Sequence, residues 1–87
     1  MKKFEELFVE LQNRALNPSE SSASSEFLAG GIHAIGKKLM EEAGELWLAL
    51  EHESKQRVAE EASQLIYFIQ LALVAREVTL DQLESEL

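Results

Sequence analysis

Residues 37–46 read Lys-Lys-Leu-Met-Glu-Glu-Ala-Gly-Glu-Leu, and a weaker copy of the second half of this stretch returns downstream. Residues 41–46, Glu-Glu-Ala-Gly-Glu-Leu, correspond to residues 60–65, Glu-Glu-Ala-Ser-Gln-Leu. On a helix that turns about 100° per residue, Glu42 falls inside an apolar stripe, and Glu61 falls inside a similar stripe of its own segment. The repeat therefore predicts two helices that each direct one carboxylate toward the core.

A carboxylate in an apolar stripe needs a compensating charge, because burying it unpaired costs several kcal/mol. The sequence offers few basic residues that face inward, so a bound cation is the most economical partner. Glu45 and Gln64 follow Glu42 and Glu61 at a spacing of three residues and flank them as further oxygen donors. Oxygen donors on two facing helices suit a hard cation, and we expect Mg²⁺, with Mn²⁺ as the alternative.

Lys38 lies one helical turn before Glu42, on nearly the same side of the helix. Its flexible ammonium group can reach a phosphate oxygen, or it can instead form an ion pair with Glu42 or Glu45. The sequence favours neither arrangement over the other. Divalent cations and a lysine at one site are typical of phosphoryl chemistry, in which charge is neutralised and a water is activated as the nucleophile.

Two other interpretations of the repeat stay open. A single E-x-x-E pair is common on helix surfaces, but two copies nineteen residues apart, each with a glutamate in an apolar stripe, are much less expected by chance. The carboxylates could still form a buried polar network that fixes the register of the helices. An oxidative di-iron bundle is less compatible, since it requires Glu-x-x-His and neither His33 nor His52 follows a glutamate at that spacing.

Composition limits the classes of function. The 87 residues predict a single domain, 1–87, near the lower size limit for independent folding. A net charge of −8 argues against binding to nucleic acid, and the absence of cysteine excludes disulfides and thiolate sites. The charged start and the lack of an apolar run of roughly 20 residues argue against a membrane segment. We therefore expect a soluble cytoplasmic protein that acts on a small molecule.

Periodicity predicts an all-α fold. Apolar residues at helical spacing indicate a first helix over 2–16, followed by a polar, serine-rich loop over 17–25 that is a linker or closes over a substrate. A second helix lies within 26–53 and is firm from Ile32, because Gly30 and Gly31 disfavour its first turns. Ser54 can cap a third helix over 55–76, and Thr79 can begin a capping box for a last helix over 80–87.

A short turn between the second and third helices predicts an antiparallel hairpin at the centre of a small helical bundle. Residues 65–75 are apolar almost all round, and Met40 and Trp47 widen the apolar surface of the second helix. One chain of this size can hardly bury such a helix, so we expect a homodimer to complete the bundle.

Residues 38–45 and 60–67, with their E-x-x-E and E-x-x-Q spacing, resemble those of the phosphoribosyl-ATP pyrophosphohydrolases, the enzymes of the second step of histidine biosynthesis. The resemblance extends from about Gly31 to the end of the chain. That family is similar to the all-α (MazG-like) nucleoside triphosphate pyrophosphohydrolases, whose pattern is E-x-x-E followed by E-x-x-D.

The resemblance implies roles for individual residues. Glu42, Glu45 and Glu61 correspond to metal ligands, and Gln64 stands at the ligand position where most members have aspartate. Glu60 is a further carboxylate that could supply the missing charge. The resemblance also places Lys38 and Glu41 in the site as catalytic residues.

The implied reaction is the hydrolysis of 1-(5-phosphoribosyl)-ATP between its α and β phosphates, which gives 1-(5-phosphoribosyl)-AMP and pyrophosphate. Two alternatives remain. One is a house-cleaning pyrophosphohydrolase that acts on free or damaged nucleoside triphosphates. The other is a non-catalytic helical module that binds a protein partner.

Overall fold

The computed structural model describes all residues, 1–87, and contains helices but no strands. Along the chain the helices are α1 (Phe4–Leu16), α2 (Ala23–Gly30), α3 (Ile32–His52), α4 (Lys55–Ala75) and α5 (Leu80–Ser85). The predicted all-α fold class is therefore confirmed. The boundaries of α1, α4 and α5 agree with the predicted segments to within two residues at each end.

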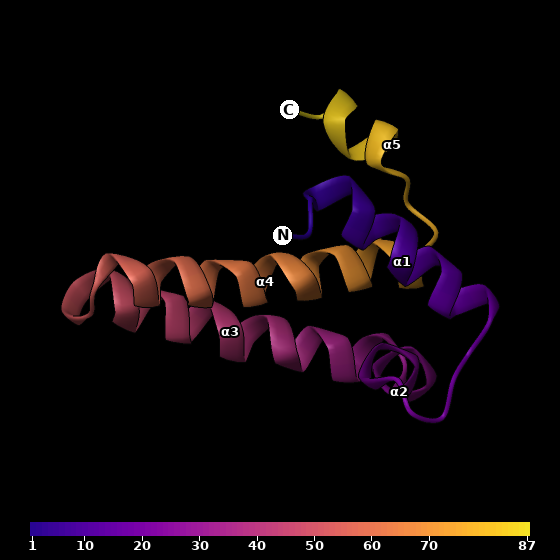
Figure 1. The fold of residues 1–87 in the computed structure, drawn as a ribbon, viewed down its shortest axis with the longest axis horizontal. Helices are drawn as coiled ribbons and strands as arrows, with labels where there is room; N and C mark the ends of the chain where they lie inside the picture. The colour runs from indigo at the N-terminus through magenta and orange to yellow at the C-terminus, as the bar shows by residue number, and fades with distance from the viewer.

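The long helices α3 and α4 lie side by side and form the central antiparallel hairpin that the sequence predicted (Figure 1). Ser54 caps the start of α4, because its hydroxyl accepts a hydrogen bond from the Arg57 backbone N–H at 3.2 Å. Thr79 and Gln82 form the predicted reciprocal capping box at the start of α5. The connection between α3 and α4 is short enough to align the two acidic segments.

The core sits at one end of the hairpin, where α1 crosses α4 and α2 packs beside α3 (Figure 1). Gln70 of α4 is fully buried there and donates a hydrogen bond from Nε2 to the Phe4 carbonyl at 3.0 Å, which ties the first turn of α1 to α4. The apolar core residues are Phe8, Leu11, Ile35, Phe68, Leu71 and Val74. The half of the hairpin nearest its turn extends beyond α1 and α2.

The prediction of an uninterrupted loop over 17–25 is wrong for its last residues, because α2 begins at Ala23. Ser22 caps this helix by accepting a hydrogen bond from the Ser25 N–H. Ser25 itself is buried and accepts a hydrogen bond from the Ser19 N–H at 3.0 Å, while Ser24 hydrogen-bonds the Tyr67 hydroxyl. The serines therefore start and anchor a helix instead of only linking two others.

Gly31 separates α2 from α3. Its φ of 90° and ψ of 173° lie in a region that is open essentially to glycine alone, and the chain changes direction there. The firm part of the second predicted helix was placed at Ile32, and α3 does begin at that residue. The segment before it is a separate helix.

By length and composition alone, α4 is apolar enough to cross a membrane. The core helix of a soluble protein meets the same criterion, and α4 also carries buried Glu61 and Gln70. The apolar character of α4 is therefore weak evidence for a membrane span.

Candidate metal centre

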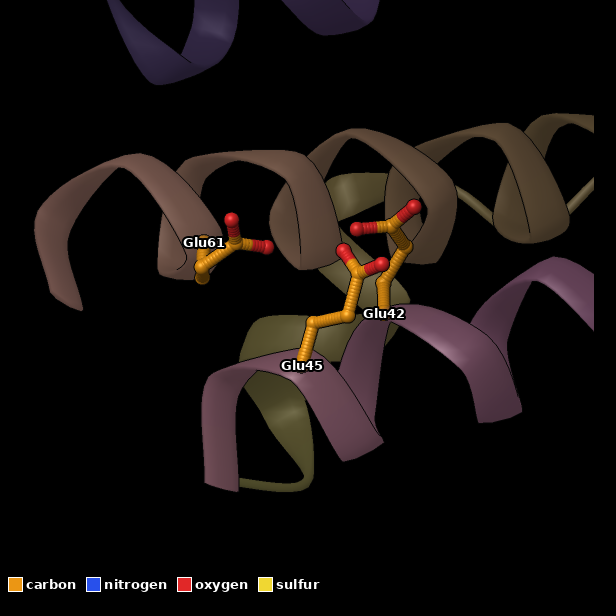
Figure 2. A group of neighbouring side chains, drawn as sticks. All are labelled: Glu42, Glu45 and Glu61. Carbon is orange, nitrogen blue, oxygen red and sulfur yellow. The ribbon is translucent and has the colours of Figure 1, made fainter. Parts of the chain in front are cut away.

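Three carboxylates converge between α3 and α4. Glu42, Glu45 and Glu61 each place one carboxylate oxygen within 4.8 Å of the other two. Glu42 and Glu45 come from α3, and Glu61 comes from α4. Figure 2 shows Glu42 and Glu45 extending from α3 toward α4, while Glu61 extends from α4 toward them. Because α3 and α4 run antiparallel, the two acidic segments face each other, as the sequence predicted.

Two of these carboxylates are buried and incompletely bonded. Glu42 is 7% exposed and Glu61 is 4% exposed, whereas Glu45 is exposed. The Oε2 atoms of Glu42 and Glu61 are buried without any hydrogen-bond partner. A polar network that only fixes helix register would satisfy its buried oxygens, since an unsatisfied buried acceptor is destabilising. The geometry therefore favours a site that is completed by a ligand.

Burial and the crowding of negative charge both affect the pKa of Glu61. Burial raises the pKa of Glu61 above its ordinary value, and the neighbouring Glu45 carboxyl raises it further. The Arg57 guanidinium lowers the pKa of Glu61 but does not outweigh the other two effects. A divalent cation between the carboxylates would remove the same repulsion without a proton.

Arg57 is the residue near the site that the sequence analysis missed. Its Nη2 contacts Glu61 Oε1 at 2.7 Å, its Nε contacts Glu53 Oε1 at 3.1 Å, and its Nη1 contacts Glu60 Oε2. The spacing of four residues between Arg57 and Glu61 was the available signal, since such pairs are neighbours on a helix. Glu60, considered as a source of extra charge for the metal, is bonded to Arg57.

The two residues expected to be catalytic contact each other. Lys38 Nζ lies 3.2 Å from Glu41 Oε2, and both side chains are partly exposed. The alternative ion pair of Lys38 with Glu42 or Glu45 does not form. Gln64 is exposed on α4, and His33 and His52 are exposed on α3 as expected. The structure thus brings together three of the four predicted metal ligands around two buried, unpaired oxygens.

The donor set fits a hard divalent cation. All the converging atoms are carboxylate oxygens, which Mg²⁺ and Mn²⁺ prefer over soft ligands. No cysteine is present, and both histidines lie outside the cluster, so the atoms that zinc and copper favour are missing from it. The unpartnered Oε2 atoms of Glu42 and Glu61 are the positions at which a cation would compensate buried charge.

Comparison with known proteins relates this chain to one enzyme family. Residues 1–87 match the family described as phosphoribosyl-ATP pyrophosphohydrolase. The phosphoribosyl-ATP pyrophosphatase of Streptomyces avermitilis is 51% identical over 87 residues, which cover 99% of this chain and 97% of that protein. The proteins of the same name from Streptomyces coelicolor and Bifidobacterium animalis subsp. lactis are 49% and 48% identical, over 97% and 100% of their own lengths. The chain belongs to the phosphoribosyl-ATP pyrophosphohydrolase family, whose members are hydrolases.

Proposed function

We propose that this chain hydrolyses 1-(5-phosphoribosyl)-ATP between the α and β phosphates, with Mg²⁺, in the second step of histidine biosynthesis. The observation that carries the proposal is the cluster of Glu42, Glu45 and Glu61 with two buried oxygens left unpaired. Membership of the family, at about half identity over the full length of its relatives, supports the choice of substrate. The products are 1-(5-phosphoribosyl)-AMP and pyrophosphate.

Glu42, Glu45 and Glu61 would hold the cation, with Gln64 as an additional neutral oxygen donor from α4. When bound, Mg²⁺ supplies charge neutralisation at the phosphate oxygens and lowers the barrier to attack by water. Burial between packed helices restricts the side chains of Glu42 and Glu61, and Arg57 additionally holds one oxygen of Glu61. The substrate is thereby held in a fixed position relative to the attacking water.

Lys38 and Glu41 act beside the metal ligands on α3. Lys38 is partly exposed and paired with Glu41, so its ammonium group can exchange that partner for a phosphate oxygen with little loss. Glu41 would then be released as a free carboxylate next to the site, where it can accept a proton from water. These roles belong to side chains already present at the edge of the carboxylate cluster.

A homodimer is part of the proposal. Around each helix of the hairpin, measured from its buried glutamate at about 100° per residue, all the large exposed apolar residues except Leu48 lie at about +80° to +160°. In an antiparallel pair the same angular sector points to the same side of the hairpin, so the residues form one face. They are Ile32, Met40, Trp47 and Leu50 of α3 with Ile66 and Ile69 of α4.

The opposite side of the hairpin is the one that α1 covers. The core residues Phe68, Leu71 and Val74 of α4 fall at about −20° to −140° on the same scale and pack with Phe8 and Leu11 of α1. The apolar face has no such cover within one chain, and a contiguous apolar patch of this kind marks an interaction site. A second copy offers an equally apolar and equally extended surface, which completes the bundle.

The decisive experiment measures pyrophosphate release from phosphoribosyl-ATP and from the ordinary nucleoside triphosphates, each with Mg²⁺ and with EDTA. We expect Mg²⁺-dependent release from phosphoribosyl-ATP at a far higher kcat/KM than from ATP. Preference for ordinary or oxidised triphosphates would support the house-cleaning alternative, and no release from any substrate would support a binding module. We further expect the protein in the cytoplasmic fraction of its host cell.

A further inference from the structure

We propose that Arg57 is a positioning residue that fixes the Glu61 carboxylate so that Oε2 is directed to the metal. The inference rests on the proposed function, since it concerns the metal site of that reaction. Arg57 Nη2 holds Glu61 Oε1 at 2.7 Å, while Glu61 Oε2 is buried without a partner. One oxygen of this carboxylate is thus held by a guanidinium, and the other has no hydrogen-bond partner.

Arg57 is itself held in place. Its Nε contacts Glu53 at the end of α3 and its Nη1 contacts Glu60 of α4, so each of its three nitrogens has a carboxylate partner. A planar guanidinium bonded at three points loses little further freedom when it orients Glu61. Arg57 is half exposed, whereas the Glu61 side chain is 5% exposed, so the guanidinium reaches the buried carboxylate from the surface.

The internal repeat shows that this arrangement is specific to one half of the site. Arg57, Glu60 and Glu61 stand nineteen residues after Lys38, Glu41 and Glu42. In the first copy the basic residue pairs with Glu41 and leaves Glu42 alone. In the second copy it contacts both Glu60 and the buried Glu61. Lys38 therefore remains available for the substrate, whereas Arg57 is bonded to Glu61, a proposed metal ligand.

The direction in which the metal affinity changes when Arg57 is removed distinguishes a positioning role from a purely electrostatic one. If Arg57 acted only as a nearby positive charge, its removal would strengthen the binding of a cation. If it orients Glu61, its removal lets that side chain turn away and weakens binding, and loss of a partner that orients a metal ligand typically lowers affinity by about 10- to 100-fold. The two effects have opposite directions, so one titration separates them.

The test is calorimetric titration of the full-length protein with MgCl₂ and with MnCl₂, without substrate. We expect Arg57→Gln to raise the Kd for either metal by about tenfold or more. Arg57→Lys should fall between that variant and the wild type, because one ammonium can contact Glu61 but cannot bridge three carboxylates. Lys55→Gln removes the same charge from an exposed position two residues away and should not raise the Kd. Circular dichroism first confirms that all variants are folded.

An unchanged or lower Kd for Arg57→Gln would overturn the positioning role, as would an Arg57→Lys affinity no better than that of Arg57→Gln. Equal weakening in Lys55→Gln would also overturn it, since the effect would then not depend on Glu61. If the wild type binds neither metal, the metal site and this inference both fail. Metal binding by the wild type without pyrophosphate release would instead refute the proposed function alone.

Discussion

Glu42 and Glu61 occupy equivalent places in the internal repeat but differ in their surroundings. Glu61 has Arg57 as a partner for one oxygen, whereas Glu42 forms no ion pair, and each keeps one buried oxygen without a hydrogen bond. The unsatisfied charge of the metal-free protein is therefore greatest at Glu42. Substitutions at these two positions should not be equivalent.

Glu42→Gln should abolish most Mg²⁺-dependent hydrolysis and leave the metal-free protein equally stable or more stable, by about 1 kcal/mol. The reason is that the amide removes a buried charge that only the cation compensates. Chemical unfolding in EDTA and in Mg²⁺ measures both effects, with the exposed Glu51→Gln on the same helix as the control. Equal destabilisation of Glu42→Gln in both solutions would show that Glu42 belongs to a structural network instead.

The raised pKa of Glu61 predicts how the stability of the metal-free protein depends on pH. Below the ordinary value of 4.5, Glu61 is protonated in both the folded and the unfolded chain. As pH rises from 4.5 through the higher pKa of the folded state, the unfolded chain loses its proton first, so the contribution of Glu61 to stability is lost. In EDTA, the free energy of unfolding should therefore fall across this window.

Glu61→Gln isolates that contribution. The variant also loses the ion pair with Arg57, which shifts its stability at every pH, so the slopes and not the absolute values are compared. We expect the wild type to lose more stability than Glu61→Gln over the window above pH 4.5. A wild-type curve that rises relative to the variant would mean that Glu61 is stabilised as a carboxylate, contrary to its burial beside Glu45.

Periodicity was sufficient to find the carboxylates but not their partners. The positions of Glu42 and Glu61 in apolar stripes follow from the helical repeat alone, and the hairpin then places Glu45 beside them. The helical repeat does not predict which carboxylates pair with Lys38 and Arg57. Each of these long side chains can reach a carboxylate three or four residues further along the helix. Packing and rotamer preferences decide that choice, and neither appears in a sequence pattern.

At the scale of the elements, α2 is the helix that sequence reasoning did not separate. Its serines are poor helix formers, and the segment has only Phe27 and Leu28 as large apolar residues that pack on the core. What stabilises α2 is tertiary: Ser25 is buried, Ser24 bonds Tyr67, and Phe27 packs edge-on against Phe68 at 5.1 Å between ring centroids. Contacts across more than forty residues of sequence leave no local signal.

Replacing the two adjacent glycines at the break between α2 and α3 by alanine should have opposite effects on stability. Gly31→Ala should lower the free energy of unfolding by about 1–3 kcal/mol, because a φ of 90° with an extended ψ is strained for any residue with a Cβ. Gly30→Ala should be neutral or stabilising, since its Cβ would meet only the Ala34 Cβ at an ordinary 3.6 Å and alanine favours a helix.

Urea unfolding of the two variants, matched in chemistry and adjacent in sequence, provides the comparison. Both are expected to retain the α3–α4 hairpin and its carboxylate cluster, because the break lies at the far end of α3 from Glu45. A Gly31→Ala protein as stable as Gly30→Ala would mean that the chain passes between the two helices with another backbone conformation.

On the scale of the whole molecule, the three carboxylates lie between α3 and α4, the two helices of the central hairpin (Figure 2). Within one chain, Met40 is 77% exposed and Trp47 is 66% exposed, although both belong to the helix that carries the cluster. The sequence predicted a chain too small to bury its own apolar helix, and the homodimer that would complete the bundle stays a prediction. Measurements in solution can identify the surface that covers this exposed apolar face.

We expect light scattering to give a mass of about twice the 9.8 kDa of one chain at micromolar concentration. Trp47→Glu combined with Ile69→Glu should weaken association by about 2 kcal/mol or more, because it places charges at the centre of a desolvated apolar face. Leu16→Glu is the matched control, since Leu16 is 78% exposed but lies on α1, away from that face. A well-folded wild-type monomer, or equal dissociation by the control variant, would show that the face of α3 and α4 does not join two chains.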